Sequence, residues 1–204
     1  CSGFTGSLRI PDSVTSLGDN AFDGCTGINE SLYIGKSLET IKSNTFSGCS
    51  EFKGNLHIGE NVKTIEKSAF DGFYKFTGQL IIPDSVSFIG DFAFCHCYGF
   101  DSLKISKSLK SINKNTFSFC HGFKGQLNIP KSLTHISSYA FYGCYGFSGS
   151  LIIPNSIKKF NEYAFARCSG FNGSLLLSES IKIIPNYAFL GCSNFTGKLT
   201  LPNE

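Results

Sequence analysis

Apolar and polar residues recur along the chain in a pattern that repeats about every 24 residues. A cysteine opens the pattern at residues 1, 25, 49, 97, 120, 144, 168 and 192, and Phe73 takes the fourth place. The interval from Cys97 to Cys120 is 23 residues. The chain therefore divides into eight repeats and a partial ninth, with the bounds 1–24, 25–48, 49–72, 73–96, 97–119, 120–143, 144–167, 168–191 and 192–204. We predict that these repeats form a single domain, 1–204.

Each position within a repeat, counted from its cysteine, has a fixed character, and the 23-residue repeat skips one position between 4 and 8. Leu at position 8 and Ile or Leu at position 10 alternate with polar residues, which predicts a short half-buried strand. Pro or Gly often follows at position 11, and glycines at positions 3, 6 and 24 allow tight bends. Positions 17 to 22 hold no more than about one helical turn. The pattern predicts an α/β repeat solenoid with one parallel sheet, mostly short strands and turns, and little helix.

Phenylalanine fills two of the inward positions. Of the 21 Phe in the chain, sixteen lie at positions 4 and 22. One repeat cannot bury such residues by itself, whereas stacked repeats cover one another. Burying a Phe side chain contributes about 1.5–3 kcal/mol, so two continuous rows of Phe make up a large part of the predicted core. The position 22 row is Phe22, Phe46, Phe70, Phe94, Phe117, Phe141, Phe165 and Phe189, and the position 4 row is Phe4, Ile28, Phe52, Phe76, Phe100, Phe123, Phe147, Phe171 and Phe195.

The repeated pattern Leu-x-Ile-Pro-x-Ser-Val-x-x-Ile-x-x-x-Ala-Phe-x-x-Cys resembles the BspA-like leucine-rich repeats, which occur in surface proteins of bacteria and mucosal protists. The extra residue in segments such as 4–8, FTGSL, resembles the protist subtype, and only the repeat 97–119 has the usual shorter spacing. The resemblance covers the whole chain. It implies a right-handed leucine-rich-repeat coil, a cell-surface or secreted location, and non-catalytic adhesion to a host or other cell-surface protein.

The stretch 93–100, AFCHCYGF, places a histidine between two cysteines. Cys97 and Cys120 hold position 1 among buried positions, where a free cysteine behaves as a small hydrophobe. Side chains of an in-register parallel ladder point the same way, and the total of nine cysteines is odd, so we predict thiols rather than disulfides. Cys95, His96 and His121 fall in one bend, where three ligands cannot easily converge as zinc requires. We therefore predict no metal and no cofactor.

The residue types that carry catalysis are scattered. The four histidines occupy four different positions of the repeat, no pair of carboxylates recurs in neighbouring repeats, and no phosphate-binding glycine motif precedes a helix. The glycines are accounted for by turns. The sequence thus predicts a protein that is not an enzyme.

The outward positions of the predicted strand, 7 and 9, are the first candidate for binding, because solenoids bind through extended surfaces. Position 7 is polar throughout, whereas position 9 varies. A merely solvated sheet face is the alternative interpretation. The position 9 candidates for ligand binding are Arg9, Tyr33, His57, Ile81, Lys104, Asn128, Ile152 and Leu176.

Charge is unevenly distributed along the chain. Residues 1–101 carry seven basic and twelve acidic side chains, whereas residues 102–204 carry eleven basic and three acidic ones. No acidic residue lies between Ser102 and Asn161. The lysines there can hold an anionic partner such as a sulfated glycan, or can form an ordinary solvated face. The candidates for anion binding are Lys104, Lys107, Lys110 and Lys131; a systematic basic stripe of the kind that binds nucleic acid is missing.

Smaller features complete the expectations. Asn29, Asn172 and Asn194 begin sequons for glycosylation, all in the same bend of the repeat. Serine recurs at position 13, where its hydroxyl is expected to bond the turn backbone. Position 20 carries Tyr139, Tyr163 and Tyr187 in successive repeats, which predicts a stacked row that shields the bend.

The two ends of the array lack the polar caps that solenoids need. Cys1 to Phe4 and Phe195 to Leu201 would expose inward residues, so we predict end-to-end self-association or cover by flanking segments. The chain begins in mid-pattern, which indicates a piece of a longer protein, and a spacer role in a longer array is a third functional hypothesis. No run of about 18 apolar residues occurs, so this segment is not expected to insert into a membrane.

Overall fold

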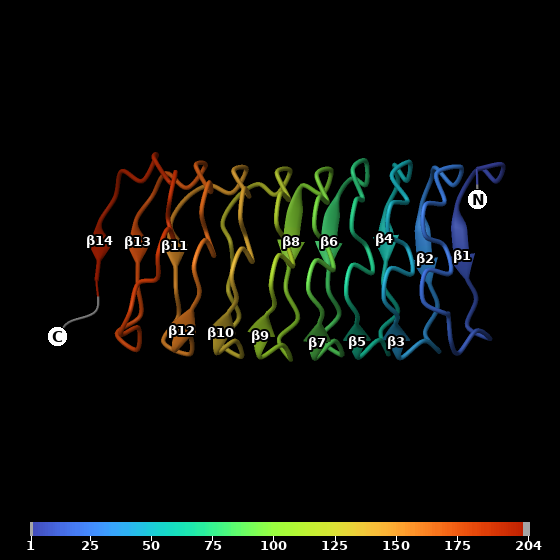
Figure 1. Ribbon diagram of the computed structural model, residues 1–204, viewed down its shortest axis with the longest axis horizontal. Helices are drawn as coiled ribbons and strands as arrows, with labels where there is room; N and C mark the ends of the chain where they lie inside the picture. The colour runs from blue at the N-terminus through green and yellow to red at the C-terminus, as the bar shows by residue number, and fades with distance from the viewer. Residues whose placement is uncertain (1, 202–204) are drawn as a thin grey trace.

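The computed structural model describes residues 2–201, which form a solenoid of about eight stacked turns. Figure 1 shows the stack from the side, with successive repeats next to one another along the long axis. Cys1 and residues 202–204 lie outside the described residues. The predicted solenoid of parallel strands is confirmed, while the single domain, the repeat bounds and the right-handed sense of the coil stay predictions.

The predicted α/β class is wrong, because residues 2–201 contain strands and turns but no helix. The backbone explains the difference. The residue at position 20 has a left-handed conformation in every full repeat, as in Asn20 (φ 56°) and Tyr163 (φ 56°), and position 24 repeats it four residues later. A right-handed helix cannot continue through such residues, so the segment closes as consecutive turns. No helix in this part of the chain is long and apolar enough to cross a membrane.

Position 8 starts a first set of parallel strands, as the alternation of apolar and polar residues predicts. The pairing keeps identical positions in register, with Leu8 opposite Leu32 and Ile10 opposite Ile34. The strands are β1 (Leu8–Ile10), β2 (Leu32–Ile34), β4 (Leu56–His57), β6 (Gln79–Ile81), β8 (Ser102–Lys104), β11 (Leu151–Ile152), β13 (Leu175–Leu176) and β14 (Leu199–Thr200).

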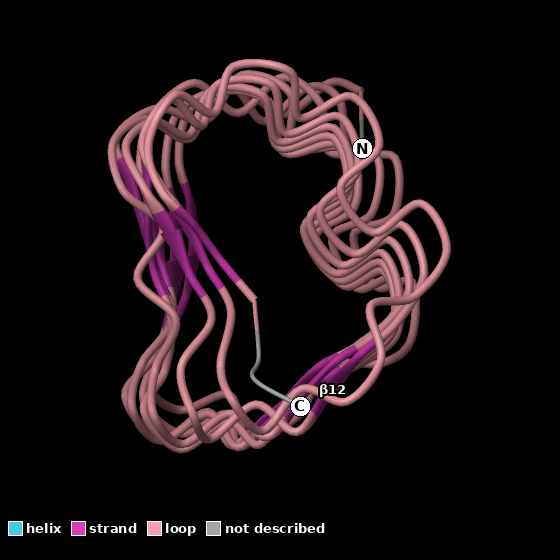
Figure 2. Cartoon of the chain, turned by 90° about the vertical axis from the view of Figure 1, so that its left-hand side faces the viewer, coloured by secondary structure: helices cyan, strands magenta, loops and turns pink. Residues whose placement is uncertain are grey.

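A second set of parallel strands lies on another side of the coil, so the predicted single sheet is wrong. Figure 2 shows the two sets in the view along the solenoid. Each strand has two residues at positions 16 and 17, and the inward residue at position 17 is buried, as Ile41 and Ile65 are. The strands are β3 (Thr40–Ile41), β5 (Thr64–Ile65), β7 (Phe88–Ile89), β9 (Ser111–Ile112), β10 (His135–Ile136) and β12 (Lys159–Phe160).

The first set of strands is divided into three sheets, β1-β2-β4, β6-β8 and β11-β13-β14. In the repeat between β8 and β11, residues 127–129 do not form a strand, and Gly125 and Phe147 make an isolated bridge instead. This gap directly follows the 23-residue repeat. The position 4 ring stacks are divided at the same place: they run from Phe52 to Phe100 and again from Phe123 to Phe195.

The predicted Phe rows are confirmed as the centre of the core. From Phe22 to Phe189 the position 22 rings stack on their neighbours, with centroids 5.1–5.9 Å apart. Phe73, which replaces the cysteine of the fourth repeat, is fully buried against Phe70 and Phe76. The end repeats are less covered, and Phe4 is 69% exposed. End-to-end self-association, which would cover such residues, stays a prediction.

Glycine at position 3 allows the closest approach between neighbouring repeats. A Cβ atom on Gly170 would lie 2.1 Å from the carbonyl oxygen of Tyr145, far inside van der Waals contact. Equivalent glycines such as Gly122 and Gly146 meet the same obstacle. At these glycines, packing between repeats rather than the backbone angles excludes a side chain.

We predict that Phe141→Ala lowers the free energy of unfolding by about 3–5 kcal/mol, because it removes a fully buried ring that stacks on Phe117 and Phe165. Phe88→Ala is the matched control, since that ring is 47% exposed, and its effect should stay within about 0.5 kcal/mol. Urea unfolding followed by circular dichroism measures both. Equal losses for the two variants would contradict the proposed role of the Phe rows.

Candidate functional site

The eight predicted position 9 residues all lie on the outward face of the first set of strands or in line with it. Six are exposed, whereas Tyr33 and Leu176 are half-buried. At the N-terminal end the guanidinium of Arg9 lies 4.8 Å from the ring centre of Tyr33, which packs at 6.3 Å on His57. These three side chains border a shallow cavity of about 400 Å³. The structure therefore confirms the surface position of the predicted row, with two of its members partly covered.

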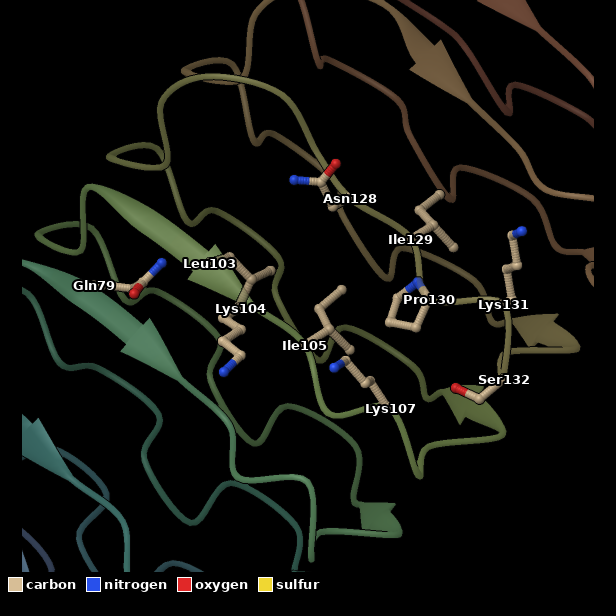
Figure 3. Close-up of a pocket in the computed structure, with 10 residues that line it drawn as sticks. All are labelled: Gln79, Leu103, Lys104, Ile105, Lys107, Asn128, Ile129, Pro130, Lys131 and Ser132. Atoms are coloured by element: carbon tan, nitrogen blue, oxygen red, sulfur yellow. The ribbon is translucent and has the colours of Figure 1, made fainter.

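The gap after β8 opens a cavity of about 530 Å³. Figure 3 shows Ile105, Ile129 and Pro130 at its centre, with Lys104, Lys107 and Lys131 around them. Ile129 is only half-buried, unlike the position 10 residues Ile82 and Ile153, because its segment does not pair as a strand. The cavity thus combines an apolar floor with a cationic rim.

The cavity unites most of the predicted anion-binding lysines. The ammonium group of Lys107 is 4.0 Å from a carboxylate oxygen of Asp84, and both side chains are at least half exposed, so this pair is weak. Lys104 and Lys131 belong to none of the salt bridges among residues 2–201. Lys110 is exposed but does not line the cavity. Three of the four predicted lysines therefore share one site.

A second cavity, of about 520 Å³, continues the first towards the C-terminus. Lys131 borders both cavities, and the second also contains the predicted contact residues Ile152 and Leu176. We call the two cavities together the lysine groove. It runs beside the repeats from β8 to β13.

Two buried hydroxyl groups mark the lysine groove. Ser132 lines the first cavity and Ser156 the second, and within the described chain the buried Oγ of neither has a hydrogen-bond partner. At the same position 13, Ser85 and Ser180 donate to backbone carbonyl oxygens at 2.8 and 3.1 Å, as the serine ladder predicts. The ladder is therefore confirmed only in part, and the two buried exceptions belong to residues that line the groove.

Cys95 and His96 form a separate cluster with Asp71 of the preceding repeat. His96 Nδ1 lies 3.1 Å from Asp71 Oδ1 and 3.3 Å from Cys95 Sγ. The thiol is buried, while the side chains of His96 and Asp71 remain 38% and 30% exposed. Burial raises the pKa of Cys95, and the nearby Asp71 carboxylate raises it further. Burial also raises the pKa of Asp71, against the bond from His96.

From the sequence, Cys95 and His96 were grouped with Cys97 and His121 but not with Asp71. Cys97 and His121 do not join the cluster, because Cys97 Sγ donates to the carbonyl of Phe70 and His121 Nδ1 bonds the carbonyl of Gly143. The available signal was the loss of glycine at position 24, where His96 has a φ of 57°.

The repeats match a known sequence profile over their full length. The BspA type leucine-rich repeat region matches in six copies, over residues 1–124, 53–172 and 123–204. The chain belongs to the BspA-type leucine-rich repeat family. No curated protein matches it.

Solved leucine-rich repeat proteins share the fold of this BspA-type chain. A leucine-rich repeat protein of Treponema pallidum is 19% identical, with a TM-score of 0.60 over 93% of this chain and 78% of its own. One from Eubacterium ventriosum is also 19% identical, with a TM-score of 0.67 over 91% of this chain and 58% of its own. At this identity the likeness shows the fold alone.

The cysteine ladder of this BspA-type protein is structural, as predicted. All eight cysteines of residues 2–201 are free, and seven are buried. The thiol at position 1 donates to the carbonyl oxygen of the position 22 Phe two repeats earlier, as Cys144 does to Phe117 at 3.0 Å. Burial raises the pKa of Cys49 to about 12 and that of Cys192 to about 11. These thiols thus stay protonated in the folded protein.

The predicted tyrosine stack is confirmed, since ring centres of Tyr139 and Tyr163 lie 4.7 Å apart and those of Tyr163 and Tyr187 4.9 Å. The sequence analysis missed a second surface row at position 2. Its members stack at 4.3–5.1 Å, and they are Tyr74, Tyr98, His121 and Tyr145. In both rows the rings cover one another's faces, which leaves mainly their edges to solvent.

The three sequon asparagines lie in surface bends. Asn29 Oδ1 accepts the amide N–H of Gly6 at 2.9 Å, and Asn172 Oδ1 accepts that of Gly149 at 2.8 Å. Asn29 is half-buried, whereas Asn172 and Asn194 are exposed. Their use as glycosylation sites stays a prediction.

We expect the position 1 thiols to resist alkylation in the folded protein. With a pKa of about 12, Cys49 holds roughly one thiolate per ten thousand molecules near pH 8. Iodoacetamide followed by peptide mass spectrometry should leave Cys49, Cys120, Cys144 and Cys168 unmodified, and all nine cysteines should react in denaturant. Rapid modification of Cys144 without unfolding would contradict a structural role.

Proposed function

We propose that this BspA-type chain is a non-catalytic module that binds a partner protein through the lysine groove. The observation that supports this most directly is the pair of buried hydroxyls, Ser132 and Ser156, without partners beside exposed lysines. A buried polar group without a hydrogen bond costs about 1–3 kcal/mol, which a ligand that bonds to it recovers. Binding to the groove can therefore gain more free energy than binding to a solvated sheet face.

The chemistry of the groove favours an acidic protein segment. A carboxylate can accept bonds from the ammonium group of Lys131 and from a serine hydroxyl, and charge-assisted bonds of this kind are the stronger ones. The apolar floor of Ile105 and Ile129 and the exposed side chain of Ile152 can then contact the neighbouring apolar residues of the partner. Two cavities in tandem suit an extended segment better than a small molecule.

A sulfated glycan is the second candidate. The observation that favours it is the stretch between Ser102 and Asn161 without any acidic residue, from which Lys104, Lys107 and Lys131 reach the groove. Such binding depends on charge more than on the apolar floor, so it should weaken strongly with salt.

We also infer a cell-surface or secreted location and no catalytic activity, both from membership of the BspA-type family. A host or other cell-surface protein is the corresponding partner. For a long partner, the position 9 row at Arg9, Tyr33 and His57 extends the contact surface.

The proposal predicts that the chain, fused to a fluorescent protein, binds to cultured epithelial cells and that Lys131→Ala weakens this binding about 10-fold or more. Lys67→Ala is the matched control, because it removes one exposed lysine away from the groove. Flow cytometry measures the binding curves. Protease treatment of the cells should abolish binding, whereas enzymatic removal of sulfated glycans should not.

Three results would each contradict one part of the proposal. Loss of binding after glycan removal, with retention on immobilised heparin that salt reverses, would support the glycan candidate instead. Equal effects of Lys131→Ala and Lys67→Ala would exclude the groove as the contact. Absence of binding to any cell would favour the spacer hypothesis.

A further inference from the structure

The cluster of Asp71, Cys95 and His96 leaves one buried hydrogen-bond donor without a partner. Both Asp71 Oδ1 and Cys95 Sγ approach the ring nitrogen His96 Nδ1, at 3.1 and 3.3 Å, and the sulfur is also 4.0 Å from Nε2. A proton on Nδ1 can bond the carboxylate and the weakly accepting sulfur. The hydrogen of the buried thiol then has no acceptor within the cluster.

The arrangement also excludes a catalytic triad. A triad needs the nucleophile at one ring nitrogen of the histidine and the carboxylate at the other. Here both groups meet Nδ1, so the carboxylate cannot orient a histidine that removes the proton of the thiol. The thiol and the carboxylate lie at the same side of the imidazole, an arrangement that suits a bound ion better than a catalytic triad.

A cation between the three atoms would replace the unpaired thiol hydrogen and use all three atoms as ligands. We propose that Asp71, Cys95 and His96 form a zinc site with three protein ligands and a fourth position open to water. Zinc accepts sulfur, imidazole nitrogen and carboxylate oxygen together, and the thiolate disfavours the hard cations Mg²⁺ and Ca²⁺. On binding, the thiol proton leaves to solvent, and the Nδ1 lone pair, the carboxylate and the thiolate all point at the metal.

The distances agree with this assignment. Ligand atoms around a tetrahedral zinc lie about 3.3–3.6 Å apart, given the usual bond lengths to sulfur, nitrogen and oxygen. The nitrogen–oxygen and nitrogen–sulfur separations of 3.1 and 3.3 Å are within a few tenths of that range, and all three ligand atoms lie within 4.8 Å of one another. Because the sulfur is also 4.0 Å from Nε2, coordination requires the imidazole and the thiol to turn until both face the metal.

The surroundings hold the ligands in place and leave a route for the metal. The His96 ring stacks on Phe119 at 5.2 Å and meets the edge of Tyr98 at 5.9 Å, which fixes its orientation. The thiol is buried behind it, whereas His96 and Asp71 are partly exposed and open the cluster to solvent. Preorganised ligands of this kind favour metal binding.

The backbone at His96 supports a specific role for this residue. Position 24 is glycine in five of the eight full repeats, all with positive φ, whereas His96 adopts a φ of 57° with a side chain. A left-handed residue other than glycine costs about 1–3 kcal/mol and persists where other interactions maintain it. At His96 this left-handed conformation places the imidazole between a carboxylate and a thiol.

Cobalt(II) substitution tests the site without any assumption about activity. Cobalt added to the apo chain should bind in a one-to-one ratio and give thiolate charge-transfer absorption with the visible bands of a four-coordinate ion, and zinc should displace it. Cys95→Ser and His96→Gly should each weaken binding at least about 100-fold, since even the residues that only orient ligands cost 10–100-fold. Isothermal titration with zinc measures the affinity.

Arg167→Gly is the matched control for His96→Gly. Arg167 holds the same left-handed position three repeats further on, with a φ of 58°, and lies outside the cluster. Both variants should fold, because glycine is the usual residue there, and circular dichroism checks this. Only Arg167→Gly should retain the cobalt spectrum. Failure of the wild-type chain to give thiolate charge transfer, or an unchanged spectrum in Cys95→Ser, would overturn the zinc site.

Discussion

The backbone of the position 22 phenylalanine is the point at which each repeat is joined to the next. Its N–H donates to the carbonyl at position 21 of the following repeat, as from Phe46 to Ala69 at 3.0 Å and from Phe141 to Ala164 at 2.9 Å. Its carbonyl accepts the thiol of the cysteine two repeats later, and its ring stacks on the equivalent ring of the next repeat. Because one residue makes three contacts across the stack, the stack keeps its register, and the inward positions cannot vary independently.

This constraint explains how the sequence predicts the core. Three features form because residues of the same type, 24 positions apart, lie side by side in the stack: the Phe rows, the free thiols and the strand at position 8. The fixed spacing of such residues is visible in the sequence. The second sheet left no such signal. Its outward position 16 holds residues as different as Thr64, Phe88 and Lys159, and each strand has only two residues. It forms because the buried residues at position 17 already bring the backbones together.

The candidate sites were predictable only where they follow the repeat. The position 9 row and three lysines of the groove were found because stacking places equal positions side by side. The groove itself arises where the strand pairing fails, beside the one repeat that is a residue shorter, and its unpartnered serines have the same sequence environment as bonded ones. Asp71 was missed because it lies 25 residues before His96 and meets it only across two repeats.

Departures from the repeat supply residues of both proposed sites, because the stack tolerates them. Where glycine gives way at position 24, the chain has His96, Phe119 and Arg167, each in a left-handed conformation that costs about 1–3 kcal/mol. An isolated loop could not maintain that conformation, but here the neighbouring repeats bond the backbone on both sides, as the N–H of His96 does with Ser118. The regular core thus holds irregular outward residues rigidly in one geometry. A binding site or a metal site can therefore form on the repeat fold without any additional domain.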